Sequence, residues 1–76
     1  MYHSIEFRLK SLANLEQPGK VQVQKIVIKP GTRVEAEVVP YVVETALGPV
    51  EMADLHFEDG GVAHGVRFAT FSFLDN

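Results

Sequence analysis

The sequence contains no cysteine among its 76 residues. Disulfide bonds and zinc sites built only from thiolates are therefore excluded. A chain of this length predicts a single domain, residues 1–76, that buries only roughly 60% of the surface its unfolded form exposes. Because the core is small and has no covalent cross-links, self-association is the source of additional stability that remains available.

Long apolar runs are also missing. No segment approaches the roughly 18 consecutive apolar residues that are needed to span a bilayer. The first residues lack a basic region followed by an apolar one, so no secretory signal is predicted. With 46% hydrophobic and 22% charged residues, the composition is typical of a globular chain, and we expect a cytoplasmic protein.

Motifs for catalysis are absent as well. No glycine-rich loop precedes a helix, which excludes a phosphate cradle of that kind. Nucleophilic catalysis needs a serine or threonine beside a base, and Thr70 and Ser72 have no histidine near them in the strand pairing expected below. The sequence therefore predicts a protein that is not an enzyme and that has no cofactor.

Basic residues are scarce after residue 33. The first 33 residues contain six of the seven basic residues and two acidic ones, a charge of +4, whereas the rest has one basic and eight acidic residues, a charge of −7. In one interpretation, the basic strands lie beside the acidic ones and neutralise them within the fold. In the other, the two halves form oppositely charged faces of the molecule, which drive head-to-tail contacts or attract a charged partner. Most aromatic residues fall in the acidic part, which disfavours binding of nucleic acid.

Apolar alternation, β-branched residues and turn formers predict five strands, at residues 2–12, 20–29, 33–46, 50–58 and 62–74. Residues 13–19 read as a loop, a change of parity suggests a bulge near Lys25, and Lys29-Pro-Gly-Thr32 reads as a turn. Whether Val27 or Ile28 faces the core stays open. The predicted fold is all-β: a five-stranded antiparallel meander, curled as an SH3-like or OB-like barrel or folded as a miniature sandwich. This likeness concerns the fold alone.

The segment from residue 38 to 57 reads as a hairpin around a Gly-Pro break. With Leu47-Gly48 at the tip, every opposed pair on one face is apolar, and a slip by one residue would turn that face outward. The predicted core face consists of Val38, Pro40, Val42, Ala53, Leu55 and Phe57. The next turn is Asp59-Gly60 or the favoured Gly60-Gly61, and both put His64 at the edge of the core.

The opposite face of this hairpin is apolar too. A sheet with one face on the core and the other exposed to solvent would carry polar residues on the exposed face. The residues of this opposite face, together with two on the last strand, are Tyr41, Val43, Val50, Met52, Phe71 and Phe73. Either a bulge at Pro40 turns this face into the barrel interior, or the face is an interface. We expect the second: a protein-interaction or assembly module that forms a homo-oligomer or binds another protein through an apolar sheet face.

The alternative function is a small barrel that binds a ligand, either single-stranded nucleic acid or a divalent metal. The predicted register places Glu37 opposite Glu58, and His56 lies on the same face. Two facing carboxylates repel unless a positive group lies between them. That group would be a metal held by Glu37, His56 and Glu58, or a basic side chain such as Lys25.

Overall fold

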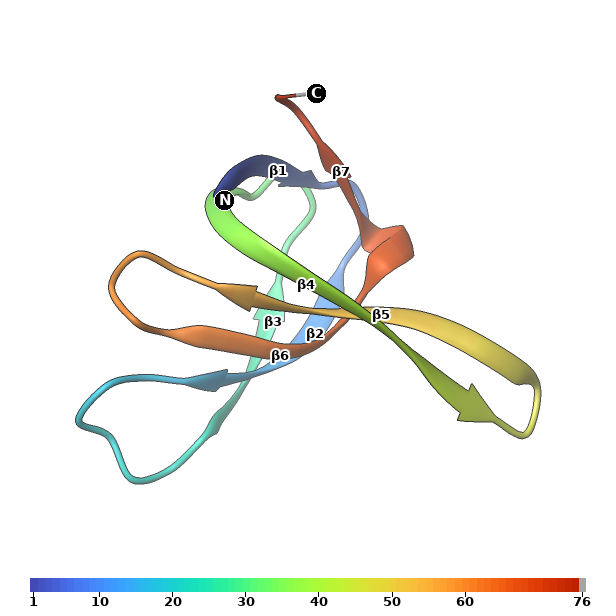
Figure 1. Cartoon of the computed structure of the whole chain (residues 1–76), viewed down its shortest axis with the longest axis horizontal. Helices are drawn as coiled ribbons and strands as arrows, with labels where there is room; N and C mark the ends of the chain where they lie inside the picture. Colours follow the sequence, from blue (N-terminus) through green and yellow to red (C-terminus); the bar gives the residue numbers. More distant parts are fainter. Residues whose placement is uncertain (76) are drawn as a thin grey trace.

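Seven strands form one antiparallel sheet, curled into a half-barrel, in the computed structural model, which describes residues 1–75 (Figure 1). The elements are β1 (His3–Phe7), β2 (Ser11–Glu16), β3 (Gln24–Ile28), β4 (Arg33–Thr45), β5 (Gly48–His56), β6 (Val62–Arg67), the 3₁₀ turn η1 (Phe68–Thr70) and β7 (Phe71–Phe73). The strand order is β3-β2-β6-β5-β4-β1-β7. The predicted all-β class and barrel-like curl are confirmed, but the predicted count of five strands is wrong.

The two extra strands arise because the first and last predicted strands each divide. The chain leaves β1 after Phe7 and re-enters the sheet at Ser11, and η1 separates β6 from β7. The two breaks contact each other: the amides of Arg8 and Leu9 both donate to the carbonyl of Thr70, at 2.8 and 3.2 Å. The Thr70 carbonyl thus satisfies two backbone amides that have left the strand ladder.

The last strand does not continue beside β5 as predicted but pairs with β1. Ile5 stands opposite Phe73, and Phe7 opposite Phe71, while the other edge of β1 pairs with β4. This arrangement curls the sheet and brings the aromatic rings of β7 onto its inner face. Phe71, at 4% exposure, belongs to the core.

The core lies on the concave side of the curled sheet. Its buried members are Ile5, Phe7, Ala13, Ala36, Ala53, Leu55, Ala63, Val66 and Phe71. The Phe7 and Phe71 rings are 5.7 Å apart at their centroids, and Phe68 lies 5.2 Å from Phe71. Tilted contacts of this kind stabilise the core beyond the burial of apolar area.

Strands β2 and β3 differ from the expected pattern. Residues 13–16, predicted as a loop, belong to β2, and the β2–β3 register runs without interruption from Leu15↔Gln24 to Ser11↔Ile28. The bulge predicted near Lys25 is therefore absent, because the valines before residue 24 lie in the loop and not in the strand. Ile28 packs against the core and Val27 faces outward. The predicted turn is confirmed, with Gly31 at φ 90° and the Thr32 amide donating to the Lys29 carbonyl at 3.2 Å.

The β4–β5 hairpin turns at Ala46-Leu47, which shifts the predicted register by two residues. Val38 now faces Leu55 and Tyr41 faces Met52. The shift follows from Gly48, which takes a φ of 112° as the first residue of β5 and so closes the turn. Because the shift is even, each residue stays on its predicted face. No bulge interrupts the register at Pro40, contrary to one of the two interpretations above.

The end of this hairpin projects beyond the rest of the sheet (Figure 1, right). On one side β1 pairs with β4 only up to Ala36, and on the other β6 pairs with β5 only from Met52 onward. Residues 41–52 thus form a ribbon that is largely two-stranded, which we call the arm. Val42, predicted in the core, is 59% exposed because the arm reaches past the core.

Strands β5 and β6 are joined by a longer turn than either predicted one. The Phe57 amide donates to the Gly61 carbonyl at 2.8 Å, so five residues, 57–61, form the loop. The register then shifts between Ala53 and Leu55, where Gly65 takes a φ of 75°. This bulge sends His64 to the outer face of the sheet, and the predicted place of His64 at the core edge is wrong.

Candidate functional site

The outer face of the arm holds four of the six predicted interface residues. Val43 stands directly opposite Val50, and Tyr41 opposite Met52. Val43 is 42% exposed and Tyr41 38%. This face therefore meets solvent in the single chain and is not part of the barrel interior.

The remaining two predicted interface residues lie elsewhere. Phe71 is in the core, and Phe73 packs against it. Both point to the concave side from β7, which is at the opposite edge of the sheet from β3 and is separated from β5 by β4 and β1. Of the predicted interface residues, Tyr41, Val43, Val50 and Met52 therefore share the outer face of the arm, and the half-exposed Val39 continues this apolar face along β4.

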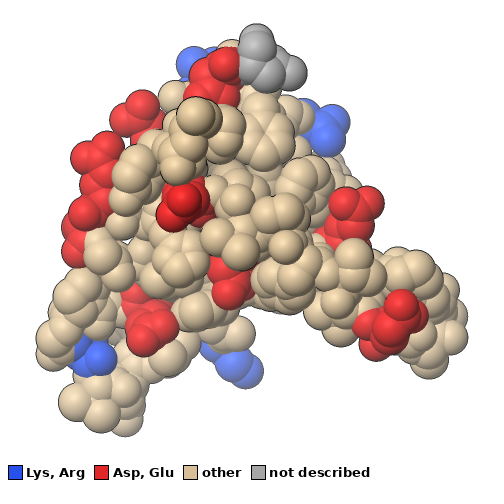
Figure 2. All heavy atoms as spheres, in the orientation of Figure 1, with Lys and Arg blue, Asp and Glu red and all other residues tan. Residues whose placement is uncertain are grey.

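The outer face of the arm carries no charged side chain. The arm's two carboxylates, Glu44 and Glu51, lie on the other face, where Glu51 is the register partner of Val42. Figure 2 shows the arm as a mostly uncharged projection, whereas acidic side chains are spread over the body of the molecule. The outer face of the arm is thus apolar, whereas the other face carries both apolar and acidic side chains.

At the base of the arm, the carboxylate of Asp54 collects three hydrogen bonds. Its Oδ1 accepts from the Tyr41 hydroxyl at 3.0 Å and from the Gly65 amide at 3.1 Å, and its Oδ2 lies 3.0 Å from His64 Nδ1. The bulge makes this possible, because it sets both His64 and Gly65 against Asp54. Asp54 thus ties the arm to β6.

The other ring nitrogen of His64, Nε2, lies 2.9 Å from Glu16 Oε1. Glu16, His64, Asp54 and Tyr41 therefore form a continuous chain of hydrogen bonds across β2, β6, β5 and β4, which we call the polar chain. Both nitrogens of the imidazole face carboxylates. The protonated ring, which donates a hydrogen bond from each nitrogen, is therefore the form that these neighbours stabilise. The polar chain thus connects the base of the arm, on β4 and β5, to two further strands, β6 and β2.

The hydrogen bonds of the polar chain change the pKa of three of its groups. The bond to Glu16, followed by that to Asp54, raises the pKa of His64 against the opposing effect of burial. Burial alone would raise the pKa of Asp54, but the bonds from Gly65, His64 and Tyr41 together lower it. Burial and the neighbouring Asp54 carboxylate raise the pKa of Tyr41.

These directions predict a pH range in which the polar chain stabilises the fold. The raised pKa of His64 gives a contribution that is complete below about pH 6.5 and is lost as the pH rises through the folded-state value. The lowered pKa of Asp54 gives a contribution that is present above about pH 3.9 and is lost as the pH falls through the folded-state value. The two contributions therefore coincide between these limits.

We expect His64→Gln to lower the free energy of unfolding at about pH 5.5 by about 0.5 to 1 kcal/mol, the range of partly exposed ion pairs. Near pH 8, where the imidazole is less protonated, the loss should be smaller. Urea unfolding at both pH values measures the difference. His56→Gln is the matched control, because His56 lies on the same outer face without an ion pair in the described part of the chain. Equal losses at both pH values for His64→Gln would contradict the polar chain.

The three residues considered for a metal do not converge. Glu37 is the register partner of His56 and not of Glu58, which lies beyond the end of β5 in the following loop. The Glu37 carboxylate is 3.1 Å from the N-terminal ammonium. Among residues 1–75, no group of three or more side chains is arranged to hold a metal ion. The predicted pairing of the two carboxylates is thus wrong, because the β4–β5 turn lies one residue earlier than predicted, at Ala46-Leu47, and so moves the register by two residues.

Sequence reasoning missed the polar chain, although one signal for it was present. An isolated glycine inside a strand pattern, here Gly65, indicates a bulge. Placing a bulge there moves His64 to the face of Asp54, as the structure has it. Nothing local to the sequence indicates the bond to Glu16, which lies 48 residues away.

No protein-family model matches the sequence, and comparisons with curated proteins and with solved structures gave no match. No helix in residues 1–75 is long and apolar enough to cross a membrane.

Proposed function

We propose that this protein is an assembly module that forms a homodimer through the outer face of its arm. A single observation carries the proposal: a half-exposed, uncharged, apolar face projects from the core on a ribbon with few neighbours. Tyr41, Val43, Val50 and Met52 are the contact residues. The projection makes this face accessible to a second chain without a rearrangement of the core.

The stability of the arm supports the proposal. A two-stranded ribbon is marginal in water, and it becomes stable when a third strand or another layer packs on it. The polar chain holds only the base of the arm, at Tyr41 and Asp54. A second apolar layer, packed face to face at about 10 Å, would remove the valine side chains from water and order the ribbon toward its tip.

Packing against another copy is favoured by the charge distribution. The part of the chain from Val34 onward carries −7, so two copies repel each other across most of their acidic surface. The outer face of the arm has no charge and can meet itself without repulsion. A two-fold axis through this face would place each residue against the same patch on the partner.

The contact should be made by the face of the arm and not by its edge. Within the described residues 1–75, the edge of β4 beyond Ala36 has no neighbouring strand. Pro40 lies in that segment and has no amide hydrogen to donate to an added strand. Such a proline protects an edge against pairing, which leaves the apolar face as the more favourable contact.

The positions of the aromatic rings favour protein contact over binding of single-stranded nucleic acid. Stacking of bases requires exposed rings among basic side chains. Phe7 and Phe71 are buried, and Phe68 and Phe73 pack against the core. Tyr41, the aromatic residue of the arm face, has its hydroxyl bound to Asp54.

Light scattering after gel filtration tests the proposal. At tens of micromolar we expect a mass of twice the 8.4 kDa of one chain, falling toward 8.4 kDa on dilution. Dissociation on dilution distinguishes a reversible dimer from an aggregate. A constant mass of 8.4 kDa over this range would overturn the proposal.

A further inference from the structure

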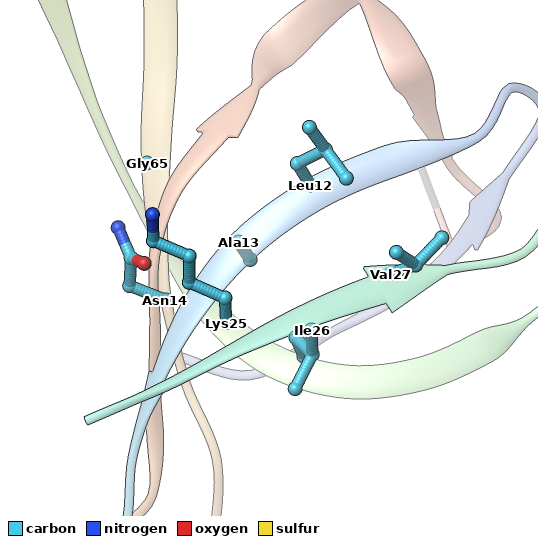
Figure 3. A pocket seen from close by; sticks show the side chains of 7 residues that line it. All are labelled: Leu12, Ala13, Asn14, Lys25, Ile26, Val27 and Gly65. Carbon is cyan, nitrogen blue, oxygen red and sulfur yellow. The ribbon is translucent and has the colours of Figure 1, made fainter. Parts of the chain in front are cut away.

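The bulge at Gly65 leaves a hollow on the outer face of the sheet, over β2 and β3 (Figure 3). Its volume is about 310 Å³, within the range of small-molecule sites. The lining residues are Leu12, Ala13, Asn14, Lys25, Ile26, Val27 and Gly65. A Cβ built on Gly65 would meet no atom within 4 Å, so the missing side chain leaves open space above the strand.

A second hollow of about 270 Å³ adjoins the first. It shares Leu12 and Gly65 with the first hollow, so the two form one groove that crosses β2 and β6. The additional lining residues are Lys10, Ser11, Met52, Arg67 and Thr70. We call the two hollows together the bulge groove.

The polar groups along the bulge groove are mostly donors without partners. Lys10, Lys25 and Arg67 border it, whereas the Lys or Arg ion pair found within residues 1–75 is Arg33 with Glu6, at 3.0 Å. Ser11 also lines the second hollow, and its hydroxyl, which is buried on the same face of β2 as Ala13, has no partner among these residues. Unpaired cations favour a ligand that only accepts hydrogen bonds, such as a carboxylate.

Two acidic residues lie beside the groove, and both are already engaged. Glu16 and Asp54 hold the two nitrogens of His64, so their negative charge is shared with an imidazole whose pKa is raised. The charges around the bulge groove therefore favour binding of an anion over binding of a cation.

The walls of the groove are aliphatic. Leu12 and Val27 are more than half exposed to solvent, and no aromatic side chain lines either hollow. Figure 3 shows Lys25 and Asn14 at one end of the first hollow and Leu12 and Val27 at the other. A ligand that matches this arrangement has an anionic head and an aliphatic body. The absence of aromatic walls excludes recognition by stacking.

We propose that the bulge groove binds a short aliphatic carboxylate. One carboxylate oxygen accepts from Lys25 Nζ and the other from the amide nitrogen of Asn14, and the chain lies along Leu12 and Val27 over Gly65. Lys10 and Arg67, in the second hollow, add to the attraction of the head group. The head-group hollow contains no residue of the arm, whereas Met52, one of the proposed dimer contacts, lines the second hollow.

Titration of the ¹⁵N-labelled full chain with octanoate, followed by NMR, tests the proposal. We expect saturable shifts at the amides of Leu12, Asn14 and Gly65. Lys25→Gln should weaken binding about tenfold, the loss of one charge-assisted hydrogen bond. Lys20→Gln, in the exposed β2–β3 loop outside the groove, should leave the affinity unchanged.

The neutral ligand 1-octanol separates recognition of the head group from simple apolar contact, and it should bind at least about tenfold more weakly than octanoate for the same reason. Three results would overturn the proposal. These are the absence of saturable shifts with octanoate, equal binding to Lys25→Gln and the unaltered chain, and shifts centred on Val43 instead of Gly65.

Discussion

Phe7→Ala is expected to remove a large part of the free energy that stabilises the fold at room temperature. Phe7 is 1% exposed, the largest of the fully buried side chains, and its ring packs against Phe71 at 5.7 Å. Removing a buried phenylalanine ring costs about 3 to 5 kcal/mol. A domain of this size has a total stability of about 4 to 11 kcal/mol, so the loss is a large part of the whole.

The position of Phe7 increases the effect. Its amide donates to the Thr32 carbonyl at 2.8 Å, and its carbonyl accepts from the Gly31 amide at 2.7 Å. β1 also joins β4 to β7, so a cavity here loosens the strand that curls the sheet. Circular dichroism with urea unfolding measures the loss.

Leu9→Ala is the control for this prediction. Leu9 is two residues away in the chain, but it is mostly exposed and lies in the break between β1 and β2. Truncation there should change the free energy of unfolding by about 0.5 kcal/mol or less. A loss for Phe7→Ala as small as that for Leu9→Ala would show that the core is not built around β1.

The faces of β4 and β5 could be predicted from the sequence, because side chains alternate with a period of two along a strand. Tyr41 and Val43 were expected opposite the core face, and the structure places them there. Their exact partners could not be predicted, since the hairpin tip depends on which residue accepts a positive φ. Gly48 does so from within β5, which moved the register by two residues.

The breaks in the first and last predicted strands could not be read from the sequence. Residues 62–74 alternate well enough to suggest one strand, yet the chain turns at Phe68–Thr70. The turn is held by the Thr70 carbonyl, which accepts from Arg8 and Leu9, and that contact spans most of the chain. Phe71 was therefore expected on the wrong face, and Phe71→Glu would unfold the protein instead of testing the interface.

The candidate site was predicted in part. The apolar pairs of the arm face follow from local alternation, whereas the polar chain and the bulge groove both depend on Gly65. The glycine is visible in the sequence, but its effect requires knowing that β2 lies on the far side of β6. Pairings between distant strands are the part that a single sequence leaves open.

Val43→Glu is expected to weaken the proposed dimer by at least about 100-fold. Val43 is 42% exposed in the single chain and lies at the centre of the uncharged arm face. In a two-fold contact each interface would bury two new carboxylates without partners, and an unpaired buried charge costs several kcal/mol. The fold should persist, because the side chain already meets solvent in the monomer.

Val42→Glu is the matched control. It makes the same change one residue earlier on the same strand, but on the opposite face of the arm, beside Glu51. Val42 is 59% exposed, so the variant should fold and add the same charge to the chain. A general effect of net charge on association would appear in both variants, and an effect of the contact face only in Val43→Glu.

The most direct test of the proposed dimer is therefore light scattering of these two variants beside the unaltered chain, at equal concentration and with circular dichroism to verify the fold. The arm-face contact predicts the mass of one chain, 8.4 kDa, for Val43→Glu and twice that mass for Val42→Glu and the unaltered chain. A dimer that survives Val43→Glu, or that both variants dissociate equally, would contradict it.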